Sequence, residues 1–97
     1  MITLQEFTIR IIKDEMESIP KKYQKPFNSM HEGLAVLREE YVELENEIFF
    51  GEKKAKEHPY TKEPGALDPK EIWKAKVRQE AVQVAAMAAR IIQELTV

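Results

Sequence analysis

The sequence predicts an all-α fold, an antiparallel helical bundle of three long helices that is completed by oligomerisation. Three segments repeat apolar residues at intervals of three and four, the spacing of one face of an α-helix. Each segment follows a residue pattern that is typical of helix starts. A chain of 97 residues has room for one domain, residues 1–97, with a modest core, and subunit contacts would enlarge that core.

The first predicted helix covers residues 4–19. Thr3 and Glu6 have the spacing of a capping box, and Pro20 cannot continue a helix. The apolar residues of this segment recur at helical spacing, which predicts one buried face. They are Leu4, Phe7, Ile11, Ile12, Met16 and Ile19.

The second predicted helix covers residues 30–50. Ser29 and Glu32 form a second capping-box pattern, and Gly51 is a candidate C-cap. The apolar stripe alternates steps of three and four, which is typical of a bundle seam. Its members are Leu34, Leu37, Tyr41, Leu44 and Ile48.

The third predicted helix covers residues 69–95. Asp68 is a candidate N-cap, and Pro69 suits the first helical position. Its stripe is Trp73, Val77, Val84, Ala88, Ile91 and Leu95. Apolar residues, many of them alanine, surround more than one side of the helix after Val82, so we expect packing on several faces and across a subunit interface.

A segment of about 17 residues, 51–67, separates the second and third predicted helices. Loops of this length are uncommon in compact domains and usually form a lid, a binding loop or a disordered segment. The segment contains the candidate phosphate-binding residues Lys54 and Lys56, and a short helical turn over 53–57 is an alternative to a loop there.

Composition limits the function. The net charge of −2 provides no basic field for nucleic acid or anionic lipid. The absence of cysteine excludes disulfides, thiolate zinc sites and cysteine nucleophiles. The N-terminal residues have neither the pattern of a signal peptide nor that of a membrane anchor. We therefore expect a cytoplasmic protein without nucleic-acid or membrane partners.

An acidic cluster, Glu39-Glu40-x-x-Glu43, is the strongest candidate for chemistry. Glu40 and Glu43 lie three residues apart and share one side of a helix, whereas Glu39 points further toward solvent. Like charges at this spacing repel each other by a few tenths of a kcal/mol, and a divalent cation would offset that repulsion. The competing interpretation is a solvated, Glu-rich helix surface.

The third predicted helix contributes Glu80 beside its apolar stripe, with Gln83 and Lys76 on the same flank. A carboxylate in that position needs a partner or a metal. If the second and third helices pack antiparallel, Glu80 faces the acidic cluster, and the oxygen ligands suit Mg²⁺ or Mn²⁺. The alternative is an ion pair between Glu80 and Lys76, one turn away.

Two stretches resemble a known family. HEGLAVLREEYVEL (residues 31–44) and RQEAVQVAAMA (residues 78–88), with Phe27-Asn28-Ser29 before them, resemble the MazG-like all-α nucleoside triphosphate pyrophosphohydrolases, in a phage and bacterial branch. The resemblance covers close to half of the chain. It implies a MazG-like helical domain that cleaves (d)NTP to (d)NMP and pyrophosphate with Mg²⁺ or Mn²⁺, as a homodimer or homotetramer.

The resemblance also implies roles for individual residues. The family pattern is Glu-Glu-x-x-Glu followed by Glu-x-x-Asp, which makes Glu40, Glu43 and Glu80 metal ligands. Gln83 stands where the family has aspartate, and it is expected to ligate through its amide oxygen. Glu39 or Glu43 would orient or deprotonate the attacking water. Lys76, Lys54 and Lys56 are the candidates for holding phosphates, the last two without a family motif behind them.

Gln83 keeps a second class of function open. Loss of the fourth carboxylate is compatible with a catalytically inactive helical adaptor or assembly protein that retains the fold. A third interpretation, a plain coiled-coil module, would leave Glu80 in solvent, and the apolar neighbours of Glu80 argue against it.

Overall fold

The computed structural model describes residues 1–18, 25–57 and 68–97. The regular secondary structure of these residues is all helical, without a strand. The elements are α1 (Leu4–Ser18), α2 (Met30–Asn46), the π-helical turn η2 (Glu47–Gly51), α3 (Glu52–Glu57) and α4 (Pro69–Leu95). The predicted fold class is thereby confirmed as all-α. Within the described ranges, no helix is long and apolar enough to span a membrane.

The predicted caps hold the starts of all three long helices. The Thr3 hydroxyl accepts from the Glu6 N–H at 3.0 Å, and the Ser29 hydroxyl accepts from the Glu32 N–H at 3.1 Å. The Asp68 carboxylate accepts from the Lys70 N–H at 2.9 Å. These side chains satisfy backbone donors that have no partner inside the helix, which explains why the sequence located the helix starts well.

The prediction that Gly51 ends the second helix is wrong. The chain passes from α2 through η2 into α3 and stays helical to Glu57, so the start of the predicted loop is helix. Gly51 is explained by crowding, since a Cβ there would lie 2.5 Å from Glu47 Oε1 and 2.7 Å from Trp73 Cδ1. The remainder of that loop, with the end of the first predicted helix at Ile19 and Pro20, lies outside the described residues.

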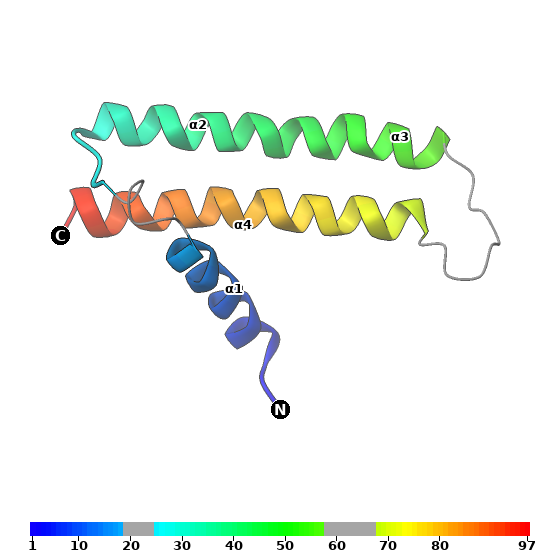
Figure 1. Ribbon diagram of the computed structural model, residues 1–97, viewed down its shortest axis with the longest axis horizontal. Helices are drawn as coiled ribbons and strands as arrows, with labels where there is room; N and C mark the ends of the chain where they lie inside the picture. The colour runs from blue at the N-terminus through cyan, green and yellow to red at the C-terminus, as the bar shows by residue number, and fades with distance from the viewer. Residues whose placement is uncertain (19–24, 58–67) are drawn as a thin grey trace.

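Figure 1 shows α2 and α4 side by side along most of their length, with α3 extending the α2 side. Near the start of α2, Gly33 lies so close to Ile91 and Leu95 that an added Cβ would be 3.1 Å from each side chain. At the other end, the Trp73 indole N–H donates to the Glu47 carbonyl at 2.8 Å. The contacts therefore occur in reverse order along the two helices, which brings the middle of α2 to the middle of α4.

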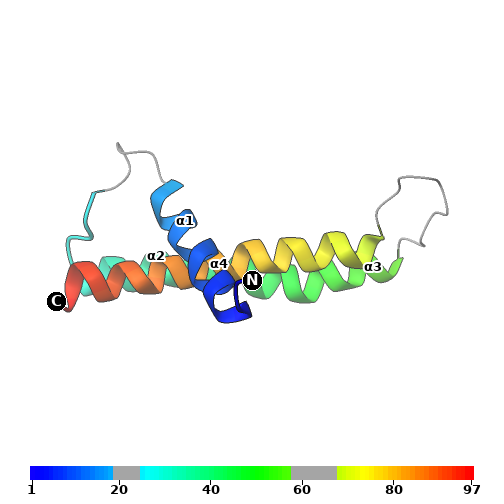
Figure 2. The same cartoon turned by 90° about the horizontal axis from the view of Figure 1, so that it is seen from below.

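The core is small and lies toward the C-terminal end of α4. Among the described residues, the buried apolar side chains are those of Phe27, Ala86 and Met87, and Met16 of α1 packs against them. Helix α1 packs on α4 and not on α2, and it projects away from the α2–α4 pair (Figures 1 and 2). The apolar stripe predicted for the first helix is thus only partly used, because Leu4 and Phe7 are exposed while Ile11 and Ile12 are half-buried.

An ion pair fixes the chain before α2 to the end of α4. Arg90 Nε donates to Glu94 Oε2 at 2.8 Å, and the Phe27 backbone N–H donates to Glu94 Oε1 at 2.8 Å. The Arg90 guanidinium also lies over the Phe27 ring, 4.1 Å from its centroid, and donates to the Lys25 carbonyl. This network holds α2 in register with α4 at one end, as the Trp73 contact does at the other.

Candidate metal centre

Three carboxylates from two helices converge where the middles of α2 and α4 meet. One oxygen each from Glu40, Glu43 and Glu80 lies within 4.8 Å of the other two. Glu40 and Glu80 are half-buried between the helices, and Glu43 is exposed. Because α2 and α4 are pinned together on both sides of this point, the carboxylates are held close by the fold.

Burial and mutual repulsion raise the pKa values of two of these groups. The pKa of Glu40 lies above its ordinary value of 4.5, first because of desolvation and then because of the charges of Glu43 and Glu80. The pKa of Glu80 is raised by desolvation and by the charge of Glu43. The cluster is therefore a site where positive charge would be stabilising.

Gln83 lies between the two half-buried carboxylates, Glu40 and Glu80. With its amide nitrogen turned toward them, it donates to Glu40 Oε2 at 2.9 Å and to Glu80 Oε2 at 3.2 Å. Ionised carboxylates are acceptors only, so this is the orientation they require. The amide supplies two hydrogen bonds to the cluster but no charge.

The donor set suits a hard divalent cation. At bond lengths of about 2.1 Å, two oxygens bound to one Mg²⁺ can be at most about 4.2 Å apart. The 4.8 Å spread of Glu40, Glu43 and Glu80 exceeds this limit by a few tenths of an ångström, which side-chain rotation can supply. Rotation of the Gln83 amide would then turn its oxygen toward the cation. The residues present therefore fit a magnesium-type or manganese-type site.

A cavity of about 720 Å³ adjoins the cluster. It lies between the second half of the α2–α3 segment and the first half of α4, and Glu43 and Glu80 form part of its wall. Phe50, Ile72 and Trp73 provide an apolar and aromatic wall beside these carboxylates. A ligand in this cavity would have one end on apolar surface and the other end at the acidic cluster.

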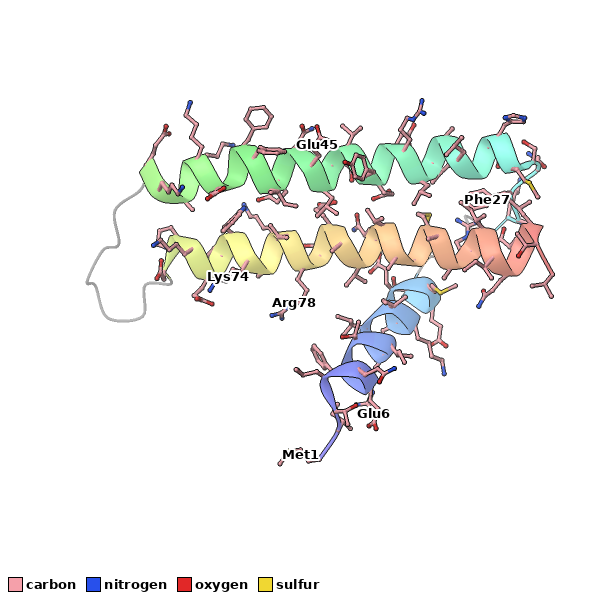
Figure 3. The ribbon with its side chains drawn as sticks, turned by 180° about the vertical axis from the view of Figure 1, so that it is seen from behind. Met1, Glu6, Phe27, Glu45, Lys74 and Arg78 are labelled. Atoms are coloured by element: carbon pink, nitrogen blue, oxygen red, sulfur yellow. The ribbon has the colours of Figure 1, made fainter. Side chains whose placement is uncertain are left out.

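Two of the three predicted lysines line this cavity. They are Lys54 of α3 and Lys76 of α4, whereas Lys56 pairs with Glu52 at 3.0 Å on the surface of α3. The predicted alternative, an ion pair between Lys76 and Glu80, is not among the ion pairs of the described residues. Figure 3 shows Lys74 and Arg78 on the edge of α4 that is turned away from α2.

Glu39 lies outside the cluster. Its side chain is exposed. Its charge raises the pKa of Glu40, but less than desolvation and the neighbouring Glu43 and Glu80 do. The structure thus brings together Glu40, Glu43, Glu80 and Gln83, and it leaves Glu39 and Lys56 apart from them.

Sequence reasoning missed the π-helical turn and its contacts. The turn η2 exposes the Glu47 carbonyl to the Trp73 indole, and it directs Phe50 to the cavity. Turns of this kind are rare, and they frequently occur at functional sites. The available signal was Gly51, which lies against Trp73. The helix pattern alone predicted a helix end at this glycine.

Comparison with known proteins gives no relative: no protein-family model, no curated protein and no solved structure matches this chain.

Proposed function

We propose that this chain is a Mg²⁺-dependent or Mn²⁺-dependent nucleotide pyrophosphohydrolase that cleaves (d)NTP to (d)NMP and pyrophosphate. The observation that carries the proposal is the convergence of Glu40, Glu43 and Glu80 within 4.8 Å, beside a cavity with an aromatic wall. The MazG-like resemblance of the two helices that hold these residues supports the same activity.

The proposed roles follow from position and charge. Glu40, Glu43 and Glu80, with the Gln83 oxygen, hold the cation, which neutralises charge on the phosphate oxygens when it is bound. Glu43 is the exposed member of the cluster, so it is best placed to orient or deprotonate a water, and Glu39 is the more distant alternative.

The cavity would hold the rest of the nucleotide. Lys54 and Lys76 line it and would bind phosphate oxygens as point charges, and Lys56 would do so only after leaving Glu52. Phe50, Ile72 and Trp73 offer apolar surface to a base. A volume of about 720 Å³ is within the range of small-molecule pockets.

The proposal includes a cellular and quaternary setting. We place the protein in the cytoplasm, where nucleotides and millimolar Mg²⁺ are found, as an antiparallel helical bundle in homodimeric or homotetrameric form. The exposed apolar side chains of Leu34 and Tyr41 on α2 support self-association.

One observation favours a second candidate, a catalytically inactive adaptor or assembly protein. With its amide nitrogen turned toward them, Gln83 donates to both Glu40 and Glu80, which would stabilise the cluster without a metal. A fold that has replaced a cation by an amide would keep its helices and lose turnover.

The deciding experiment is pyrophosphate release from a panel of nucleoside triphosphates with Mg²⁺ or Mn²⁺. The proposal expects release that is lost in Glu40→Gln and retained in Glu45→Gln, an exposed carboxylate on the same helix. Absence of release from every nucleotide, with no binding of either cation, would refute the enzyme and favour the adaptor.

A further inference from the structure

Glu47 is a half-buried carboxylate of the cavity wall that holds neither the cation nor a phosphate in the proposed function. Its backbone carbonyl accepts from the Trp73 indole at 2.8 Å. Its side chain takes part in no hydrogen bond or ion pair among the described residues. Both oxygens of an ionised carboxylate are acceptors, so Glu47 offers two acceptor positions to a ligand in the cavity.

The Glu47 side chain lies between the acidic cluster and the aromatic wall. A Cβ at Gly51 would be 2.5 Å from Glu47 Oε1 and 2.7 Å from Trp73 Cδ1, so the carboxylate and the edge of the indole flank the same point of the backbone. On the other side, the pKa of Glu80 is raised by desolvation, by the charge of Glu43 and, least, by the charge of Glu47. Glu47 is therefore near both ends of the cavity wall.

The two walls of the cavity present their groups in the same order. On the α2 side, a step of four residues leads from Glu43 to Glu47, and a step of three leads on to Phe50. On α4, seven residues separate Glu80 from Trp73. At 1.5 Å per residue, each wall runs about 10 Å from a carboxylate of the cluster to an aromatic ring. Because the helices make contacts in reverse order, the two series run side by side.

A nucleoside triphosphate has its own groups in a matching order. Its phosphates carry the charge that a cation at the cluster would bind, and its base has flat faces that stack on aromatic side chains such as Phe50 and Trp73. The sugar joins the two and comes level with Glu47. Carboxylates in dinucleotide-binding folds accept from the 2′-hydroxyl of a ribose, so Glu47 has the chemistry that this position requires.

We propose that Glu47 accepts from the adjacent 2′- and 3′-hydroxyls of the sugar and makes the site selective for ribonucleotides over 2′-deoxyribonucleotides. This deepens the proposed function and rests on its placement of a nucleotide in the cavity. A site that hydrogen-bonds a hydroxyl rejects an analogue without it, because a half-buried acceptor then loses its partner. The base is held by its faces, so the selectivity is independent of the base.

The test measures binding without turnover, by calorimetric titration in Mg²⁺. The ligands are α,β-methylene-ATP, in which a methylene group replaces the oxygen of the bond to be cleaved, its 2′-deoxy counterpart, and the same pair with uracil. We expect the wild type to bind each ribo analogue at least about tenfold more tightly than its deoxy counterpart. Glu47→Ala should bring the two dissociation constants to within about twofold of each other.

Glu45→Ala is the matched control. It removes an exposed carboxylate of α2 that does not line the cavity, so it should keep the wild-type ratio. Circular dichroism and tryptophan fluorescence check the fold of Glu47→Ala, in which the backbone carbonyl that binds Trp73 is retained. The ratio for the wild type tests the proposal even without a folded variant.

Equal binding of the ribo and deoxy analogues by the wild type, or no binding of either, would overturn the proposal. A Glu47→Ala variant that keeps the wild-type ratio would do the same, as would a preference that follows the base and not the sugar. Pyrophosphate release is measured separately. Selective binding without release contradicts only the proposed enzyme, and release without selectivity contradicts only the role of Glu47.

Discussion

With its amide nitrogen turned toward α2, Gln83 of α4 donates to Glu40 Oε2 at 2.9 Å and thereby joins α4 to the acidic cluster of α2. An amide is the one common side chain that can serve such a cluster in two ways. Its nitrogen stabilises carboxylates when no cation is present, and its oxygen can bind a cation after a rotation of the amide.

Removing one carboxylate should stabilise the protein in the absence of divalent cations. The charge of Glu43 raises the pKa values of both Glu40 and Glu80, so Glu43→Gln relieves two repulsive contacts. At a few tenths of a kcal/mol for each contact, we expect the melting temperature to rise by about 2–5 °C at pH 7. Glu45→Gln is the control and should leave it unchanged.

The same variant has a defined pH dependence. Glu40 and Glu80 have raised pKa values in the folded chain, so folding binds protons at these groups. The repulsive cost is absent below about pH 4.5 and grows as the pH rises through the raised values. The gain from Glu43→Gln should therefore vanish in acid, and an equal gain at pH 4 and pH 7 in thermal melts would show that charge is not its cause.

A fourth carboxylate should strengthen cation binding. Gln83→Asp replaces the neutral amide between Glu40 and Glu80 by a charge. We expect Mg²⁺ to bind about tenfold more tightly, pyrophosphate release to rise, and the melting temperature without cation to fall. Gln79→Asp, at an exposed position one turn earlier, should change none of these quantities.

The network at the other end of the helix pair should stabilise the fold in a pH-dependent way. Hydrogen bonds from Arg90 and from the Phe27 N–H lower the pKa of Glu94. The stabilisation is complete above about pH 4.5 and is lost as the pH falls through the lowered value. We expect Glu94→Gln to cost about 1–2 kcal/mol in urea unfolding at pH 7 and much less near pH 3. Glu71→Gln, which breaks an exposed pair with Lys74, should cost almost nothing.

Gly51 should tolerate no side chain. A Cβ at this position would lie 2.7 Å from Trp73 Cδ1, on the wall of the cavity, so Gly51→Ala must displace the indole or the η2 turn. We expect a loss of about 1–3 kcal/mol and a shift in tryptophan fluorescence, since Trp73 is the sole tryptophan. Gly33→Ala meets only side-chain carbons at 3.1 Å and should cost less; a larger loss there would contradict this explanation.

Local chemistry explains which features the sequence could predict. Ser29 and Asp68 act on neighbours two or three residues away, and Glu40 and Glu43 share a helix side by spacing alone. Contacts between distant residues could not be read in the same way. The crowding at Gly51 depends on Trp73, and the role of Glu94 depends on Phe27, 67 residues earlier in the chain.

The surface left open by a single chain was also only partly predictable. The step of three and four from Leu34 to Ile48 indicated a seam, and the structure shows that one helix, α4, covers just one side of it. A periodic pattern gives the width of an apolar stripe but not the number of partners that share it.

Calorimetric titration of Mn²⁺ into the wild-type protein and into Glu80→Gln tests the metal centre most directly. We predict one ion bound per chain in the wild type and at least tenfold weaker binding in the variant, because Glu80 is the carboxylate that α4 contributes to the cluster. No binding to the wild type, or equal binding to both proteins, would contradict a metal site shared by α2 and α4.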